Sequence, residues 1–333
     1  MTLTYYSRAV HLALAAEMRR DPRVFVMGED VRQGVMGPTQ GLLQEFGADR
    51  VRNTPISEAT LVGTGIGAAA AGMRPVVDLM VGSFVYGAMD QVANQAGKLR
   101  YMMGGQLELP LVIMAAHGVS SSAAAQHSDS VHPYLMQSGP WIVVAPSTPR
   151  DAAGLLVSAI RSPNPVAFFF HNGLGGERED LPDDVTPEPL GRSRVLEEGS
   201  DVTVVANGLM AIRALRARER LAESGISVEV VDPRTWHPLD EPGLCASARK
   251  TGRLVVVEEA RRSCSGGSEI LARVASATWG DLSAPPVLVA TPDLPVPFAP
   301  PLEAEMIPSV ERIEEAVRQV TASGRKASVE RSP

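Results

Sequence analysis

The chain has 333 residues, of which 44% are hydrophobic and 5% aromatic, so it is long enough to bury the cores of two globular domains. Its formal net charge of -7 lacks the basic excess that a nucleic-acid partner requires, so we expect none. The two cysteines, Cys245 and Cys264, form no CxxC motif and no cysteine-histidine cluster, which argues against zinc and iron-sulfur sites.

Residues 1–20 carry the first predicted helix. Their apolar stretch is interrupted by His11 and Glu17 and has no basic start, which indicates an amphipathic helix rather than a secretory signal. Residues 59–73 form the longest apolar region, but they are rich in Gly and Ala and too few to cross a bilayer. We therefore expect a buried helix there and a cytoplasmic protein without a membrane partner.

Short apolar or β-branched runs alternate with helical patterns along the chain. This alternation is typical of an α/β protein with mainly parallel sheets covered by helices. The expected strands are residues 24–27, 75–81, 109–115, 141–144 and 166–170 in the first half and 202–206, 226–231 and 254–257 in the second, where helices are expected over 211–224 and 267–278.

A stretch rich in Pro, Asp and Glu, residues 177–189, separates the two halves and has no apolar periodicity. The last residues are polar and contain a terminal proline, which is typical of a mobile end. We therefore predict two doubly wound domains, at residues 1–180 and 201–322, joined by a linker at 181–200 and followed by a flexible tail at 323–333.

The run Thr54-Pro55-Ile56-Ser57-Glu58 comes directly before the Gly/Ala-rich helix, with Ser57 near its N-cap and Glu58 in its first turn. The simplest interpretation is that this carboxylate stabilises the helix N-terminus. Because the helix that follows is almost wholly apolar, Glu58 could instead face a partly desolvated cavity. There a carboxyl would keep its proton longer, as acid-base chemistry requires.

Inside the same helix, residues 65–70 fit the dinucleotide pattern GxGxx(G/A), but the glycines fall after the helix has begun. Gly63, Gly67 and Ala71 recur at intervals of four residues, which predicts close helix packing instead. The chain also has no GDG followed by NN and no GxxxxGK(S/T) loop. It therefore shows no phosphate-binding motif of its own.

Three histidines, His117, His127 and His132, are expected in a Ser/Ala-rich loop after the strand at 109–115. Loops at the carboxyl ends of parallel strands are where ligands bind in such sheets. The alternative is that these histidines are simply solvated. Their number, with Ser128 and Asp129 between them, favours a polar site. Phe84 and Tyr86 follow another strand and would in isolation be core or rim aromatics.

Many segments in fixed order carry a resemblance to a known family. They are Met27-Gly28-Glu29-Asp30, Thr54-Pro55-Ile56-Ser57-Glu58, Asp90-Gln91-Val92-Ala93-Asn94-Gln95, Lys98-Leu99-Arg100-Tyr101, Pro146-Ser147-Thr148-Pro149, Asp232-Pro233-Arg234-Thr235 and Glu258-Glu259-Ala260. From Tyr5 to Val320 the chain resembles the beta subunits of thiamine-diphosphate-dependent 2-oxo-acid dehydrogenases, which act on pyruvate, branched-chain 2-oxo acids or acetoin. The resemblance implies the pyrimidine-binding and C-terminal domains of a transketolase-like fold.

The resemblance also implies roles for single residues. Glu58 is similar to the glutamate that hydrogen-bonds the aminopyrimidine ring of thiamine diphosphate and so assists deprotonation of its thiazolium carbon. Phe84 stands at the position that packs on the pyrimidine, while Ile56 and Glu29 would also bind the cofactor. His127 resembles a loop histidine near the reacting carbon, where it would donate or orient a proton.

The chain departs from the family around the expected substrate loop, whose residues here are His117, Gln126, Ser128, Asp129 and His132. The usual His-His-Ser-Gln reads Gln126-His127-Ser128-Asp129, and the following Pro-Glu reads Val131-His132. An arginine is replaced by Met114, an aromatic residue by His117, and Glu-Pro-Lys by Phe170-His171-Asn172. The donor and the acceptor are therefore left open.

The implied partners follow from the same resemblance. An alpha subunit would hold the pyrophosphate and its Mg²⁺ in an α2β2 heterotetramer, and a K⁺ ion would bind carbonyls near Leu111 and Asn164. The donor would be a small 2-oxo acid or a sugar phosphate, and the acceptor a lipoylated acyltransferase or an acyl carrier protein. Two alternatives remain: transfer of a two-carbon unit to a carrier-protein thiol, and a non-catalytic assembly subunit.

Overall fold

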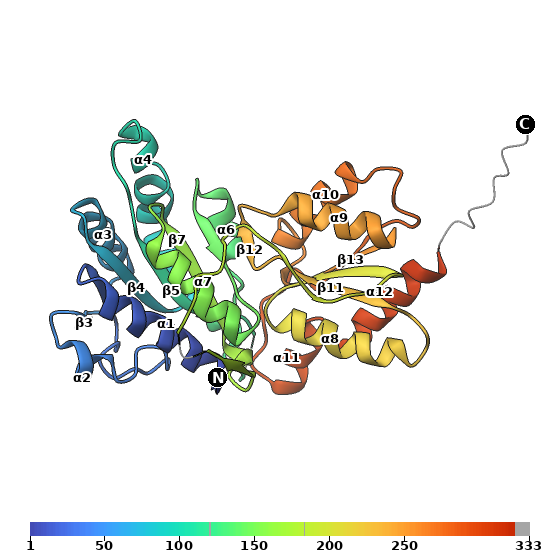
Figure 1. The fold of residues 1–333 in the computed structure, drawn as a ribbon, viewed down its shortest axis with the longest axis horizontal. Coiled ribbons are helices and arrows are strands. Elements are labelled where there is room, and N and C mark those ends of the chain that lie inside the picture. Colours follow the sequence, from blue (N-terminus) through green and yellow to red (C-terminus); the bar gives the residue numbers. More distant parts are fainter. Residues whose placement is uncertain (120, 183, 324–333) are drawn as a thin grey trace, which may run out of the picture.

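The computed structural model describes residues 1–119, 121–182 and 184–323, and Figure 1 shows two α/β halves lying side by side. The first half is built on a seven-stranded sheet and the second on a five-stranded sheet. The predicted fold class is confirmed. Within the described ranges, no helix combines the length and the apolar character needed to cross a membrane.

The larger sheet has the order β12-β6-β7-β5-β4-β2-β3 and is parallel except for β12. Its strands are β2 (Val24–Gly28), β3 (Val51–Asn53), β4 (Arg74–Val81), β5 (Val112–His117), β6 (Ile142–Val144), β7 (Val166–His171) and β12 (Thr235–His237). The strand expected at 109–115 thus begins later and ends at His117. Since β12 comes from the second half, the two halves share this sheet.

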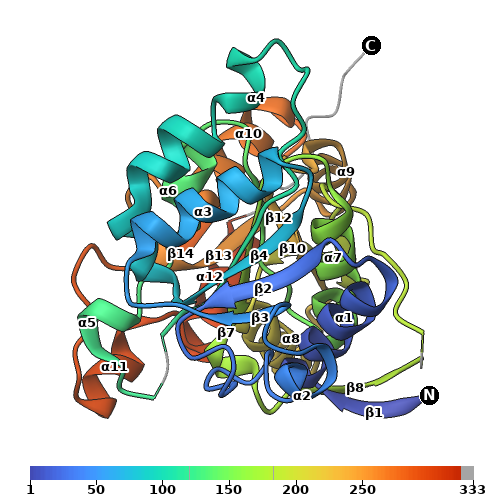
Figure 2. The same cartoon turned by 90° about the vertical axis from the view of Figure 1, so that its left-hand side faces the viewer.

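Helices cover both faces of the larger sheet, as Figure 2 shows on either side of β2 and β4. On one face lie α1 (Tyr6–Arg20) and α7 (Pro149–Arg161); on the other lie α3 (Glu58–Ala70), the 3₁₀ helix η1 (Gly82–Ala88), the π-helix η2 (Gln91–Ala96) and α6 (His132–Gln137). Successive side chains of β7 point to opposite faces of the sheet. Phe168 packs toward α1 and α7, whereas Phe169 packs toward α3 and α6.

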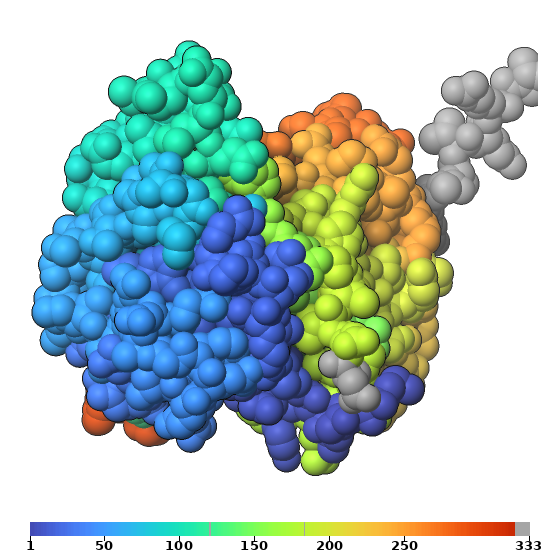
Figure 3. All heavy atoms as spheres, turned by 60° about the vertical axis from the view of Figure 1, so that its left-hand side comes forward, coloured from blue at the N-terminus to red at the C-terminus, as the bar shows by residue number. Residues whose placement is uncertain are grey.

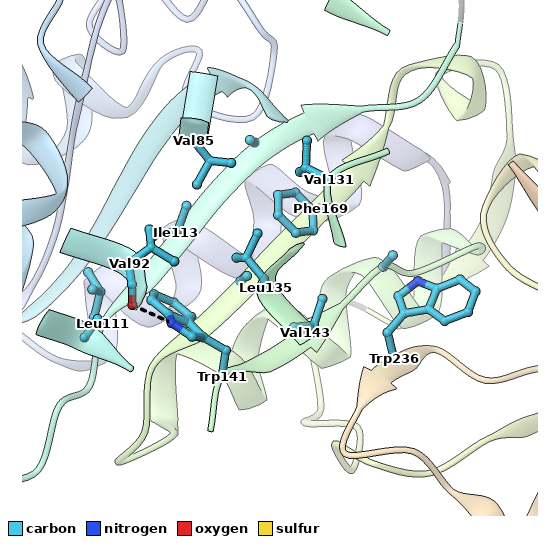
Figure 4. Close-up of a cluster of buried hydrophobic side chains, with 14 of the residues drawn as sticks. Val85, Val92, Leu111, Ile113, Val131, Leu135, Trp141, Val143, Phe169 and Trp236 are labelled. Carbon is cyan, nitrogen blue, oxygen red and sulfur yellow. Dashed lines mark hydrogen bonds between the residues drawn. The ribbon is translucent and has the colours of Figure 1, made fainter. Parts of the chain in front are cut away.

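The core under α3 and α6 is drawn in Figure 4, where Trp141 lies among Leu111, Ile113 and Leu135. The indole is fully buried, and its Nε1 donates to the carbonyl of Val92 (3.1 Å). That bond satisfies the polar end of a large apolar side chain and ties η2 to the entry of β6.

In the second half the sheet order is β14-β13-β10-β11-β9, with β9 antiparallel and the rest parallel. The strands are β9 (Arg194–Glu197), β10 (Val202–Ala206), β11 (Val228–Asp232), β13 (Leu254–Arg261) and β14 (Val287–Thr291), and the helices are α8 (Leu209–Ala222), α9 (Glu241–Thr251), α10 (Gly266–Ala277), α11 (Pro300–Met306) and α12 (Val310–Ala322). Helices α8 and α12 cover one face, and α9 and α10 the other.

Short elements complete the chain: β1 (Thr2–Tyr5), β8 (Arg178–Leu181), α2 (Leu42–Phe46), α4 (Leu99–Met102), α5 (Ala124–His127) and η3 (Asn172–Leu174). Strand β1 pairs with β8, so the helix expected over residues 1–20 begins only at Tyr6. The linker expected at 181–200 contains β9, so the chain enters the second sheet before residue 200. Of the tail expected at 323–333, residues 324–333 lie outside the described part.

A buried polar network joins the two halves. The Arg234 guanidinium from the second half donates to Asp151 Oδ1 (2.8 Å) and Glu188 Oε2 (3.0 Å). Gly208 N donates to Ser147 Oγ (2.7 Å) across the same interface. Asp151 is fully buried, and a buried carboxylate needs such charged partners. The contacts fix how the second half sits on the first.

The glycines of α3 lie within the helix, as expected, but within this chain the close approach is made by a different glycine from those of the predicted stripe. Gly65 makes the close approach, since a Cβ there would lie 2.6 Å from Val77 Cγ2. A Cβ on Gly63 would meet only Gln91 at 3.7 Å, and one on Gly67 would meet nothing within 4 Å. The sheet lies on the side of the helix that carries Gly65, which periodicity alone did not reveal.

Candidate active site

Glu58 is the first residue of α3, with Ser57 at the N-cap as predicted. The Ser57 hydroxyl donates to Thr60 Oγ1 (2.8 Å) rather than to a backbone amide. The Glu58 carboxylate is half-buried and, within the described residues, makes no side-chain hydrogen bond or ion pair. A Cβ on Gly87 would lie 3.4 Å from its Oε2, so the carboxylate rests against η1. It is thus available for a ligand.

Phe84 and His127 meet beside this carboxylate. Their ring centroids are 5.5 Å apart, with the planes at 75°. In a 3₁₀ helix, residues three apart lie on the same side, so Phe84 shares the side of η1 on which Gly87 contacts Glu58. His127 is the last residue of α5 and is exposed, and the Ser83 hydroxyl donates to the carbonyl of Gln126. The structure therefore brings Glu58, Phe84 and His127 to one surface.

Ile56 and Glu29 border the same surface. The Ile56 side chain is 70% exposed, and Glu29 follows directly after β2 and is partly exposed. Thr54 N donates to the carbonyl of Gly28 (3.0 Å), so the segment that carries Ile56 runs beside Glu29. These five residues form what we call the open half-site: Glu29, Ile56, Glu58, Phe84 and His127.

The other two histidines lie elsewhere, which corrects the expectation of three in one loop. His117 is the last residue of β5, and His132 is the first residue of α6; both are buried. A fourth histidine, His171, ends β7 directly opposite His117 in the sheet register. The ring of His117 lies 5.3 Å from that of His171 and 6.3 Å from that of His132.

His171 was missed as a site residue because it continues the apolar run of β7, residues 166–170. The signal that could have found it is the parallel pairing of β5 with β7, which places the two strand-end histidines side by side. We call His117, His132 and His171 the buried histidine cluster.

Two consecutive glutamates of β13 pair with this cluster across the interface. His132 Nε2 donates to Glu258 Oε1 (2.7 Å), and its ring stacks on Trp236 at 4.5 Å. His171 Nε2 donates to Glu259 Oε2 (2.7 Å) while its Nδ1 accepts from the backbone of Gly173. Contact with His171 holds the pKa of Glu259 below its usual range, although burial opposes this.

His117 differs from its neighbours, because neither of its ring nitrogens has a hydrogen-bond partner among the described residues. Burial lowers the pKa of His117 well below 6.5, and the adjacent His171 and His132 lower it further. The ring is therefore neutral at physiological pH.

The remaining residues of the expected substrate loop occupy three different settings. Gln126 is exposed, and Ser128 is buried with no partner for its hydroxyl in the described part of the chain. Asp129 accepts from Arg261 Nη2 (2.7 Å) and from the Tyr86 hydroxyl (3.1 Å). The loop therefore faces the second half as well as the open half-site.

A cavity of about 860 Å³ lies between the halves, lined by Ser128, Asp129, Glu259, Arg261, Cys264 and Asp293 among others. Figure 3 shows a notch on the outer surface between the projection around α4 and the second half. None of the residues of the open half-site lines this cavity. No group of three His, Cys, Asp or Glu residues in the described ranges could hold a metal ion.

Comparisons with known proteins match both halves. Residues 4–177 match the family "Transketolase, pyrimidine binding domain", and residues 191–313 match "Transketolase, C-terminal domain". A solved structure of a "Split gene transketolase, inactive beta4 tetramer" superposes with a TM-score of 0.79 at 25% identity and covers 97% of this chain and 100% of the other.

Relatives of known function are similar over nearly the whole length. The beta subunit of acetoin:2,6-dichlorophenolindophenol oxidoreductase from Cupriavidus necator is 43% identical, over 95% of this chain and 97% of its own. The pyruvate dehydrogenase E1 beta subunit of Rhizobium meliloti is also 43% identical, over 94% of this chain and 68% of its own. The 2-oxoisovalerate dehydrogenase beta subunit of Bacillus subtilis is 39% identical, over 96% of this chain and 99% of its own. The chain therefore belongs to the family of transketolase-like beta subunits found in thiamine-diphosphate-dependent 2-oxo-acid dehydrogenases.

Proposed function

We propose that this chain is the beta half of a thiamine-diphosphate-dependent enzyme that decarboxylates a 2-oxo acid and passes the acyl group to a lipoyl or other thiol acceptor. The observation that carries the proposal is the open half-site. Its carboxylate, aromatic ring and imidazole lie on one surface, and the Glu58 carboxylate has no protein partner among the described residues. The full-length similarity to dehydrogenase beta subunits supports the same reading.

The residues present fit the pyrimidine end of the cofactor. Glu58 would hydrogen-bond the ring nitrogen, Phe84 would pack on the ring face, and Ile56 and Glu29 would line its edge. Thiamine diphosphate supplies the electron sink that allows carbon dioxide to leave. The contribution of Glu58 is to hold a proton at the ring nitrogen, which a buried carboxyl does more readily once a ligand covers it.

His127 would act on the substrate side. Its imidazole is exposed, so it can reach a bound 2-oxo acid, and its edge contact with Phe84 limits its rotation. An imidazole exchanges protons near neutral pH, so His127 suits the proton transfer that accompanies acyl transfer. We also propose that Gln126 contributes to the substrate loop from its exposed position.

An alpha subunit would complete the site by holding the pyrophosphate and Mg²⁺, in an α2β2 heterotetramer. The sequence offers no phosphate-binding motif, and the open half-site contains no lysine or arginine that could replace one. A K⁺ ion would bind backbone carbonyls where residues 109–111 run beside 162–164; the carbonyl of Leu111 accepts from Val166 N (2.8 Å) and retains a second lone pair.

Transfer of a two-carbon unit from a sugar phosphate is the second candidate, favoured by the transketolase of known structure that superposes on this chain. The acceptor would then be a carrier-protein thiol. The higher identity to the dehydrogenase subunits makes the first candidate the better supported one.

The test uses the chain alone and with the alpha subunit that co-purifies with it. Calorimetry should show thiamine diphosphate with Mg²⁺ binding tightly to the complex and poorly to the isolated chain. The complex should release carbon dioxide from pyruvate or a branched-chain 2-oxo acid. Tight binding by the isolated chain would contradict the split site, and turnover of sugar phosphates without carbon dioxide release would favour the second candidate.

A further inference from the structure

The segment that carries His127 has little internal support. It comprises residues 121–131, which we call the histidine loop, and its one helix, α5, is four residues long. Ser121, Ser122 and Ala124 adopt φ values of 57°, 57° and 61°, a left-handed conformation that is costly for residues other than glycine. A segment strained in this way keeps its shape only if contacts from outside determine it.

Besides the contacts from η1, three of those contacts come from the end of one strand in the second half. Glu259 of β13 accepts a hydrogen bond from the backbone amide of Val119, just before the loop. Arg261 donates to Asp129 (2.7 Å) within the loop, and Glu258 accepts from His132 (2.7 Å) just after it. Three side chains within four residues of β13 thus bind both ends of the loop.

The three side chains are themselves fixed. Glu258 also accepts from the backbone amide of Gly267 at the start of α10, and Glu259 also accepts from His171. Glu258 and Glu259 belong to the buried strand end, so their carboxylates cannot turn to solvent without losing their hydrogen bonds to His132 and His171. We call Glu258, Glu259 and Arg261 the β13 clamp.

Asp129 extends the clamp to the half-site. Its second oxygen accepts from the Tyr86 hydroxyl (3.1 Å), and Tyr86 belongs to η1, the element that carries Phe84. The Asp129 side chain is 15% exposed, so its pairing with Arg261 is screened less than a surface ion pair. Asp129 therefore links β13, the histidine loop and the expected cofactor-binding helix.

We propose that the second half of the chain positions His127 for the reaction through the β13 clamp, with Asp129 as the principal contact. This inference rests on the proposed function and adds Asp129, Glu258, Glu259 and Arg261 to it as positioning residues; none of them belongs to the open half-site. Asp129 and His132, the two residues that the clamp binds by their side chains, differ from the usual residues of the resemblance.

The test is Asp129→Asn in the assembled complex, with Asp281→Asn as the matched control. Asp281 pairs with Arg249 (2.9 Å) within the second half of the chain. Both side chains of this pair are half-exposed, and both residues are far from the histidine loop in sequence. Two assays separate the steps: carbon dioxide release with 2,6-dichlorophenolindophenol as oxidant, and acyl transfer to a lipoylated peptide. Hydrogen exchange of residues 121–131 reports the loop independently of activity.

The clamp predicts that Asp129→Asn lowers the kcat of acyl transfer about 10- to 100-fold, as expected for a misplaced catalytic group, with an unchanged KM for the 2-oxo acid. Loop exchange should rise, and the thermal midpoint should match that of the control. Arg261→Met should give the same loss, and the double variant should lose no more than either single one, because both remove the same contact.

Faster loop exchange with an undiminished kcat would overturn the proposal, as would unchanged exchange. A parallel fall in thermal midpoint and cofactor affinity would show a merely structural role and overturn it as well. Full activity of a Glu58→Ala complex would instead defeat the proposed function, whatever the loop exchange shows, so the two failures are distinguishable.

Discussion

The same residue types appear in two contrasting regions of this molecule. In the open half-site, a glutamate, a histidine and an aromatic ring are partly or fully exposed, and the Glu58 carboxylate has no protein partner among the described residues. At the interface between the halves, Glu258 pairs with His132, which stacks on Trp236, and all three are buried.

The contrast shows which contacts stabilise the fold and which are reserved for a ligand. A buried charge without a partner is costly, and the interface carboxylates Asp151, Glu258 and Glu259 all accept hydrogen bonds. The Glu58 carboxylate is only half-buried, so the lack of a hydrogen-bond partner in the protein destabilises the fold little. It can therefore remain without a partner until a cofactor and a second subunit cover it. Substitutions in the two regions should therefore affect different measurements.

The largest effect is expected on activity from Glu58→Ala. Loss of the acid that assists cofactor activation should lower kcat of the assembled complex by about 10²- to 10⁴-fold. Since the carboxylate makes no hydrogen bond or ion pair with the described residues and interacts only with the N-terminus of α3, the free energy of unfolding of the isolated chain should change by less than about 1 kcal/mol. Turnover assays and urea unfolding check the two parts. Unchanged turnover would revive the non-catalytic assembly subunit.

Glu258→Ala should lower the stability of the chain strongly, unlike Glu58→Ala. It leaves His132 and the amide of Gly267 without a partner in a buried setting, which should lower the free energy of unfolding by about 3–5 kcal/mol. The urea midpoint of the isolated chain measures this loss. A midpoint equal to that of Glu58→Ala would show that the interface pairs carry no more stability than the open half-site.

The pH dependence of stability should report the buried His117. The pKa of His117 is lowered in the folded chain, so below pH 6.5 the unfolded chain binds a proton that the folded chain does not. Its contribution to stability should therefore fall on acidification through pH 6.5, by up to about 1.4 kcal/mol per pH unit. Burial also lowers the pKa of His11, so His117→Phe should reduce the slope rather than abolish it in urea unfolding series between pH 5 and 7.5. A slope that the substitution does not reduce would contradict an uncharged, buried His117.

The smallest effect is expected from Arg249→Ala, which removes the exposed ion pair with Asp281. Both side chains are half-exposed, so the pair should contribute less than about 1 kcal/mol and weaken further in salt. Thermal unfolding at low and high ionic strength measures it. A loss as large as that of Glu258→Ala would erase the distinction between surface and interface pairs.

Much of the fold could be predicted because its signals are local, whereas the roles of the residues in the open half-site were implied by the resemblance. Strand-helix alternation revealed the α/β class, and the capped, Gly/Ala-rich helix put Glu58 at its first turn. The residues expected around the pyrimidine, including Phe84 and Ile56, follow strand ends or helix starts that the pattern located within a few residues.

The sequence by itself determined the class of fold, the order of most strands and helices, and the type of side chain at each strand end, because hydrophobic periodicity and capping act over a few neighbouring residues. Tertiary structure decided that Gly65 rather than Gly67 packs on the sheet, that His171 joins His117, and that β13 reaches the histidine loop. These contacts join residues that are distant along the chain. They depend on strand pairing and burial, which local sequence patterns do not encode.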